Sequence, residues 1–264
     1  MQKEYNMKQV GVNFLNIVNL QTLVVTAVSV IATWICLING WVIDLPTGLI
    51  GLAIVFPIVF SINAAYRRRE DALKSFASLK AHMIALYYVH RDWTPGDDND
   101  AHVVRMRGLF LAMFVAVQQA LNEEEDSKEG LTAVYAVFSK ISKSIEQLRA
   151  AGMAGGEVSR SNQYMRNGMI DFERMLNIGQ YRTPVSLRAY SQVFLNLFPL
   201  LFAPYFAFLS TEHAAITGFM MAILYSVVLV SLDNIQENLE NPYDAIGMDD
   251  LNLNVGTLYM DVVE

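Results

Sequence analysis

Residues 45–69 read LPTGLIGLAIVFPIVFSINAAYRRR, and this stretch decides the class of fold. Its first part, residues 45–66, contains no Asp, Glu, Lys or Arg. About 20 mostly apolar residues are enough to cross the hydrocarbon core of a bilayer as a helix. Three consecutive arginines, Arg67–Arg69, follow at once. The stretch therefore predicts a membrane-spanning helix that ends at a charged boundary facing water.

Three further windows also lack charged residues: 9–43, 189–211 and 213–232. The chain has 264 residues, of which 53% are hydrophobic and 17% charged, whereas soluble globular proteins carry roughly 25% charged residues. Together the windows predict four spans, near residues 23–41, 45–65, 193–209 and 214–232. These spans must be helices, because the apolar runs are too long and continuous for barrel strands.

This charge pattern excludes a plain soluble enzyme and a disordered protein. A disulfide scaffold is excluded as well, because Cys36 is the only cysteine. We therefore expect an all-α membrane protein with four transmembrane helices per subunit and a cytosolic helical domain.

The basic residues predict the orientation of the chain in the membrane. All 19 Lys and Arg residues except Lys3 and Lys8 lie between Arg67 and Arg188. Positive charge stays on the cytoplasmic side, so both termini and the central block are predicted to be cytoplasmic. This indicates a multi-pass protein of a plasma membrane or a bacterial inner membrane.

The same pattern predicts four regions. Residues 1–66 would form an N-terminal helix and spans 1–2, residues 67–188 a cytosolic helical domain, residues 189–232 spans 3–4, and residues 233–264 an acidic cytosolic tail. Apolar residues at helical period predict three cytosolic helices, near 103–117, 131–148 and 158–176. The tail holds apolar residues that we expect to dock on the protein: Leu251, Leu253, Val255, Leu258 and Tyr259.

No motif for catalysis stands out, so we expect no enzyme. The sequence lacks a phosphate loop, a dinucleotide glycine motif and a nucleophile elbow. A metal site formed by His82 and His90, eight residues apart, is one alternative. The simpler interpretation is that both are polar residues on a half-exposed helix. Nothing predicts nucleic-acid binding.

The span at 45–65 carries a bulky apolar stripe formed by Leu52, Phe56 and Phe60, which Asn63 continues toward the cytosol. If several copies surrounded an axis, these residues would form hydrophobic rings that gate a pore by dewetting. The positive edges of phenylalanine rings tolerate an anion. From periodicity alone, contact with lipid is the simpler explanation of the stripe.

Three segments together resemble the bestrophin family, over essentially the whole chain. The second span, with its exit Asn63-Ala64-Ala65-Tyr66-Arg67, resembles the hydrophobic neck of that family. The segment Tyr181-Arg182-Thr183-Pro184-Val185 is similar to the family's approach to its third span. The segment Glu240-Asn241-Pro242-Tyr243, followed by Asp249-Asp250, is similar to its Asn-Pro-Phe and acidic cluster.

The resemblance implies a homopentamer in a lipid bilayer that conducts chloride or other small anions passively through a central pore. The partners of a subunit would be further copies of itself. The implied sites are a pore neck at Leu52, Phe56 and Phe60, pore residues below it at Asn63 and Arg67, and a cytosolic aperture at Thr183 and Val185. Calcium is the one cofactor that it leaves open, at Asp249 and Asp250.

Departures from the family pattern keep two alternatives open, a cation-selective channel of the same fold and a non-conducting membrane scaffold. Thr183 is polar where the family commonly has an aliphatic residue. Pro57 inside the neck removes one backbone hydrogen bond, so we expect a kink there. Arg67–Arg69 could concentrate anions, although anchoring the span at the cytoplasmic surface would equally explain them.

Overall fold

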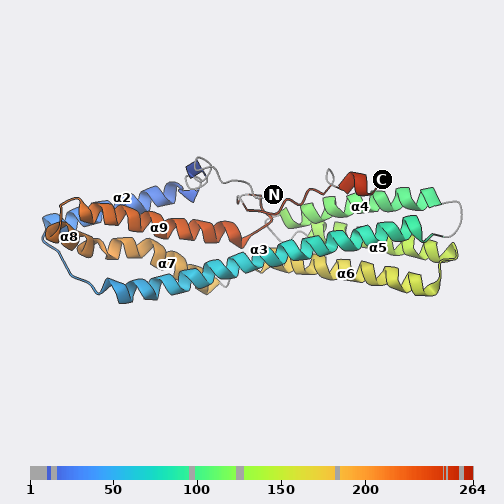
Figure 1. The fold of residues 1–264 in the computed structure, drawn as a ribbon, viewed down its shortest axis with the longest axis horizontal. Coiled ribbons are helices and arrows are strands. Elements are labelled where there is room, and N and C mark those ends of the chain that lie inside the picture. The colour runs from blue at the N-terminus through green and yellow to red at the C-terminus, as the bar shows by residue number, and fades with distance from the viewer. Residues whose placement is uncertain are drawn as a thin grey trace. The chain divides into compact units, whose positions relative to one another are not determined.

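A computed structural model describes residues 11–12, 17–94, 99–122, 128–181, 185–245, 247, 249–255 and 259–263. The regular elements of these residues are all helical (Figure 1), which confirms the predicted all-α class. In chain order they are α2 (Leu20–Ile38), α3 (Thr47–Asp92), α4 (Asn99–Asn122), α5 (Lys128–Ala150), α6 (Gly155–Gln180), α7 (Val185–Leu201), α8 (Ala203–Glu212), α9 (Thr217–Glu240) and the short 3-10 helix η1 (Met260–Val262).

The chain forms two compact units. Unit 1 comprises residues 1–66 and 183–240, and unit 2 comprises residues 67–182 and 241–264. Helix α3 contributes to both, because its residues up to Tyr66 belong to unit 1 and those from Arg67 to unit 2. The helical periodicity of the three predicted cytosolic helices is confirmed by α4, α5 and α6, each slightly longer than predicted.

Unit 1 is built from helices that could cross a membrane. In it α2 packs against α7, α8 and α9, and Figure 1 shows α2 and α9 side by side. Three helical stretches of the described chain are long and apolar enough to span a bilayer: Leu20–Ile38, Gln192–Glu212 and Thr217–Glu240. The remaining predicted span, at 45–65, falls on the first part of α3 and stays a prediction.

The predicted third span, near 193–209, consists of two helices. Helix α7 ends at Leu201 and α8 begins at Ala203, with Pro204 in its first turn. Proline has no N–H to donate to the preceding turn, but it fits the first turn of a new helix. By contrast, Pro57 lies inside α3, and helical structure continues on both sides of it.

Unit 2 has one hydrophobic core, formed by the second part of α3 with α4, α5 and α6. Its fully buried side chains include Leu79, Phe110 and Phe138. Leu253 and Val255 of the C-terminal tail are buried in the same core, and Leu251 and Tyr259 pack against it. These contacts confirm that the tail docks on the protein; the fifth residue expected to dock, Leu258, lies outside the described residues.

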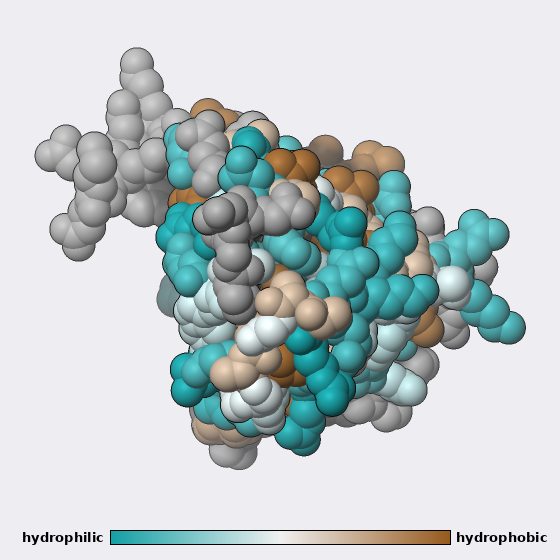
Figure 2. Space-filling view, turned by 90° about the vertical axis from the view of Figure 1, so that its right-hand side faces the viewer, coloured by the Kyte–Doolittle hydropathy of each residue, from teal (hydrophilic) through white to brown (hydrophobic). Residues whose placement is uncertain are grey.

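The two units differ in the surface that they expose. In unit 1, α2 alone leaves Leu23, Ile31 and Trp34 more than half exposed. Figure 2 views the face on the right of Figure 1, where α3 and α5 end and α4 and α6 begin, and it shows a mainly hydrophilic surface with scattered hydrophobic residues. A surface of the first kind suits lipid or another protein, and one of the second kind suits water.

Candidate functional site

One face of α3 packs inside unit 1. Ile58, Ser61 and Ala65 are almost completely buried, with exposed fractions of 3%, 1% and 0%. Ile58 belongs to a hydrophobic cluster with Leu195 of α7 and Phe206 of α8. A helix turns by about 100° per residue, so the three buried positions of α3 fall within about 60° of arc. This face anchors α3 to the rest of unit 1.

The predicted neck and pore residues of unit 1 lie on the opposite face. Phe56 and Phe60 are 56% and 68% exposed, and Asn63 is exposed as well. These three positions also fall within about 60° of arc, and the centre of that arc is about 160° from the centre of the buried face. The Phe56 and Phe60 rings are stacked, with their centroids 6.3 Å apart. Most of the surface of the Phe56 and Phe60 side chains is therefore left uncovered by the rest of unit 1.

Leu52 is the third residue of the predicted neck. It belongs to α3, but its side chain lies outside what the structure describes. Of the predicted aperture, Thr183 lies outside the described residues, and Val185 is the first residue of α7, with its side chain again outside that part. The neck and aperture assignments therefore stay predictions.

The three arginines that follow this span have different environments. Arg67 is exposed. Arg68 donates from Nη1 to the carbonyl oxygen of Tyr181 at 2.5 Å and from Nη2 to that of Ile178 at 2.6 Å. Arg69 donates from Nε to the carbonyl oxygen of Asp249 at 2.9 Å and pairs with Glu70 at 2.7 Å.

Arg68 thereby satisfies carbonyl groups at the C-terminal end of α6, where a helix leaves carbonyls without partners and its dipole favours a cation. The sequence did not indicate this role, because it does not show which of three adjacent arginines lies beside the end of α6. Of the three, Arg67 is the most exposed.

Both residues of the acidic pair proposed for calcium accept hydrogen bonds from other residues of the protein. The carbonyl oxygen of Asp249 accepts the bond from Arg69, and Oδ2 of Asp250 accepts from the backbone N–H of Gly247 at 3.0 Å. Within the residues that the structure describes, no three His, Cys, Asp or Glu side chains come together as metal ligands. A calcium site at this pair stays a prediction.

The alternative of a metal site formed by His82 and His90 is wrong. His90 is completely buried, and both ring nitrogens are engaged: Nδ1 lies 2.7 Å from the carbonyl oxygen of Leu86 and Nε2 lies 2.8 Å from Oγ of Ser144. Burial lowers the pKa of His90 to about 4. The Nδ1 of His82 lies 3.0 Å from Oδ2 of the buried Asp171. His90 is thus a core histidine on the buried face of α3, whereas His82 is partly exposed, as expected for a half-exposed helix.

Asn19, a few residues before the first predicted span, has a structural role that we did not predict. Its side chain caps α2 by accepting from the backbone N–H of Thr22 at 3.0 Å, and it donates to Oδ1 of Asn234 on α9 at 3.0 Å. The spacing Asn19 to Thr22 is a capping pattern visible in the sequence. The bond to Asn234 joins residues 215 apart in the chain, and nothing local could have indicated it.

Comparisons with known proteins agree on the fold. No protein-family model and no curated protein sequence matches the chain. Among solved structures, it is similar to one described as a membrane protein, with a TM-score of 0.76 and 19% identity over 89% of this chain and 94% of that one. Two structures of a bacterial bestrophin homolog from Klebsiella pneumoniae match with TM-scores of 0.72 and 0.73 and identities of 20% and 19%. Both matches cover 89% of this chain, and 94% and 92% of the respective homolog. The chain therefore has a bestrophin-like fold.

Proposed function

We propose that this protein is the subunit of a membrane ion channel, in which several copies surround a central pore. The exposed face of α3 would line that pore, with Leu52, Phe56 and Phe60 forming the neck and Asn63 and Arg67 lying below it. Thr183 and Val185 would form the cytosolic aperture. The stoichiometry that we propose is five, with the copies of the chain as each other's partners in the bilayer.

The observation that carries the proposal is the division of α3 into two faces. Ile58, Ser61 and Ala65 hold the helix in its own subunit, while Phe56, Phe60 and Asn63 face outward. Lipid contact would suit the two phenylalanines, but an asparagine amide facing hydrocarbon lacks hydrogen-bond partners and costs free energy. A face that combines aromatic and polar side chains is better suited to a narrow pore that water enters at one end.

We propose that the conducted ions are small anions such as chloride, moving passively. Arg67 would place one positive charge per subunit below the neck, and a ring of such charges attracts anions. The edges of the Phe56 and Phe60 rings carry partial positive charge, which disfavours an anion less than a cation. Basic residues on one side of the spans support cytoplasmic termini and a cytoplasmic unit 2.

The domain organisation belongs to the same proposal. Residues 1–66 and 189–232 would form the membrane part, residues 67–188 the cytosolic domain, and residues 233–264 the cytosolic tail. The membrane would be a plasma membrane or a bacterial inner membrane.

Flux into liposomes tests the proposal. Purified protein is reconstituted with a chloride gradient, and the reversal potential is measured. A reversal potential near the equilibrium potential of chloride supports anion conduction. One near the equilibrium potential of the cation supports the cation-selective alternative of the same fold. Protein that assembles as a ring but conducts no ion refutes the channel and leaves a membrane scaffold.

A further inference from the structure

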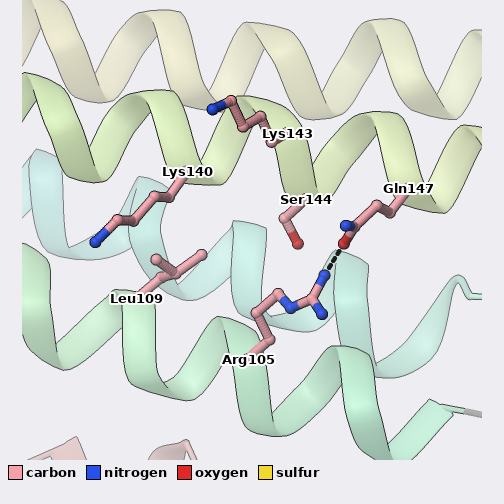
Figure 3. Close-up of a pocket in the computed structure, with 6 residues that line it drawn as sticks. All are labelled: Arg105, Leu109, Lys140, Lys143, Ser144 and Gln147. Carbon is pink, nitrogen blue, oxygen red and sulfur yellow. Dashed lines mark hydrogen bonds between the residues drawn. The ribbon is translucent and has the colours of Figure 1, made fainter.

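A small cavity lies between α4 and α5 in unit 2 (Figure 3). Its volume is about 290 Å³. The residues that line it are Arg105, Leu109, Lys140, Lys143, Ser144 and Gln147. Figure 3 shows Arg105 and Leu109 reaching from α4 toward Ser144 and Gln147 of α5.

The residues around the cavity include several cations, while the wall itself is mainly apolar. Half of the six lining residues are cations, Arg105, Lys140 and Lys143, and none is an acid. In the part of the chain that the structure describes, none of the three forms an ion pair. The nearby acid of the same helix, Glu146, pairs with Arg149 at 3.6 Å. Like charges three residues apart on one helix repel each other, so Lys140 and Lys143 leave a positive potential that a bound anion would offset.

The polar groups of the lining complement these charges. Arg105 donates from Nη1 to Oε1 of Gln147, which fixes the guanidinium and turns the side-chain amide so that its NH₂ remains able to donate. Ser144 is buried and bonded to His90, which stays neutral because burial lowers its pKa to about 4. His90 therefore adds no positive charge beneath the cavity.

We propose that this cavity binds a phosphate group with at least two negative charges, carried by a small organic molecule or by a lipid headgroup. Arg105 would hold two phosphate oxygens with its planar guanidinium, Lys140 would supply a second charge, and the amide of Gln147 would donate a further hydrogen bond. Leu109 offers apolar surface for the organic part. In Figure 3 the ammonium groups of both lysines, Lys140 and Lys143, point away from Arg105, so their flexible stems would have to swing to bring the charges over the ligand.

The size of the cavity limits the ligand. Pockets for drug-sized ligands run from about 300 to 1,000 Å³, so this cavity, at about 290 Å³, has room for a phosphate with a small organic body. The site lies entirely within unit 2 and does not depend on ion conduction. A bound phosphate would hold α4 and α5 together. Occupancy of the site would then rise with the concentration of phosphorylated compounds around unit 2.

Calorimetric titration with inorganic pyrophosphate tests the site, on the full-length protein in phosphatidylcholine nanodiscs at constant ionic strength. We expect saturable binding with one site per subunit. Lys140→Gln, which removes one exposed cation, should weaken binding by at least about fivefold, in line with a charge-assisted hydrogen bond. Arg105→Gln should weaken it more. Lys128→Gln is the matched control, since Lys128 is an exposed lysine of the same helix outside the lining.

The result that overturns the site is either no saturable binding by the unaltered protein or equal binding by Lys140→Gln and Lys128→Gln. A second series, in nanodiscs that contain phosphatidic acid, separates the two sources of phosphate. If a lipid headgroup occupies the site, pyrophosphate binds more weakly in those discs to the unaltered protein, and the lipid has no further effect on Lys140→Gln. If the source is a free phosphate, the lipid changes the pyrophosphate affinity of neither the unaltered protein nor Lys140→Gln.

Discussion

Truncating Phe60 to alanine tests the proposed neck at the more exposed of its two described phenylalanines. The Phe60 side chain is 68% exposed within its own subunit, so only about a third of its surface packs there. Truncating a fully buried phenylalanine costs about 3–5 kcal/mol, and a third of that is about 1–1.7 kcal/mol. The variant should therefore fold and assemble, and any large effect on ion flow should come from the pore.

Loss of the ring should raise conductance, because it widens the neck and makes water enter more readily. The hydrophobic free energy of one phenylalanine side chain is about 1.5–3 kcal/mol. If five truncations together lower the permeation barrier by only about 1.4 kcal/mol, conductance rises about tenfold. Single-channel recording in planar bilayers would show this directly, as a larger unit current or as an unblocked leak.

Ile31→Ala is the matched control for this experiment. Ile31 is an apolar residue of α2 that is 55% exposed, and α2 is not part of the proposed pore lining. It should leave the unit current close to that of the unaltered protein. Unchanged currents for both Phe60→Ala and Phe56→Ala would refute the neck assignment.

Three further substitutions test contacts in the fold. Arg68→Gln removes two charge-assisted bonds to the end of α6 and should lower the free energy of unfolding by about 1.5–3 kcal/mol, seen as a lower midpoint of thermal unfolding that Arg68→Lys partly restores. His90 has a pKa of about 4 in the folded state against 6.5 when unfolded, so the unfolded chain takes up the proton first as the pH falls. Stability should fall by about 3 kcal/mol between pH 6.5 and pH 4 in a denaturation series, and His90→Gln should flatten that slope; an equal slope in both proteins would contradict the assignment. Gly218→Ala would place a methyl group against the backbone carbonyl of Phe206, so folded yield should collapse, whereas Gly108→Ala has open space and should be neutral or stabilising by up to about 1 kcal/mol.

Features that repeat along the chain were predictable from the sequence. The spacing of apolar residues indicated α4, α5 and α6, and the absence of charge indicated the helices of unit 1. The face of α3 with Phe56, Phe60 and Asn63 could also be selected in advance, because helical period alone places these residues together.

Features that depend on distant partners were not predictable. The bonds from Arg68 to the end of α6 and from Asn19 to Asn234 join residues more than 100 positions apart. The burial of His90 depends on Ser144, 54 residues away. Local sequence shows that such residues are polar, but their tertiary neighbours decide whether they cap a helix, fill a core or face water.

Chemical access at Asn63 shows whether the exposed face of α3 lines a pathway for ions, as we propose. The native thiol of Cys36 is buried and is first replaced by alanine, and Asn63→Cys is then introduced. If the claim holds, a charged, water-soluble thiol reagent applied to reconstituted protein modifies position 63 and changes the current at once. Modification by a membrane-soluble reagent alone, with the current unaltered by the charged one, would contradict it.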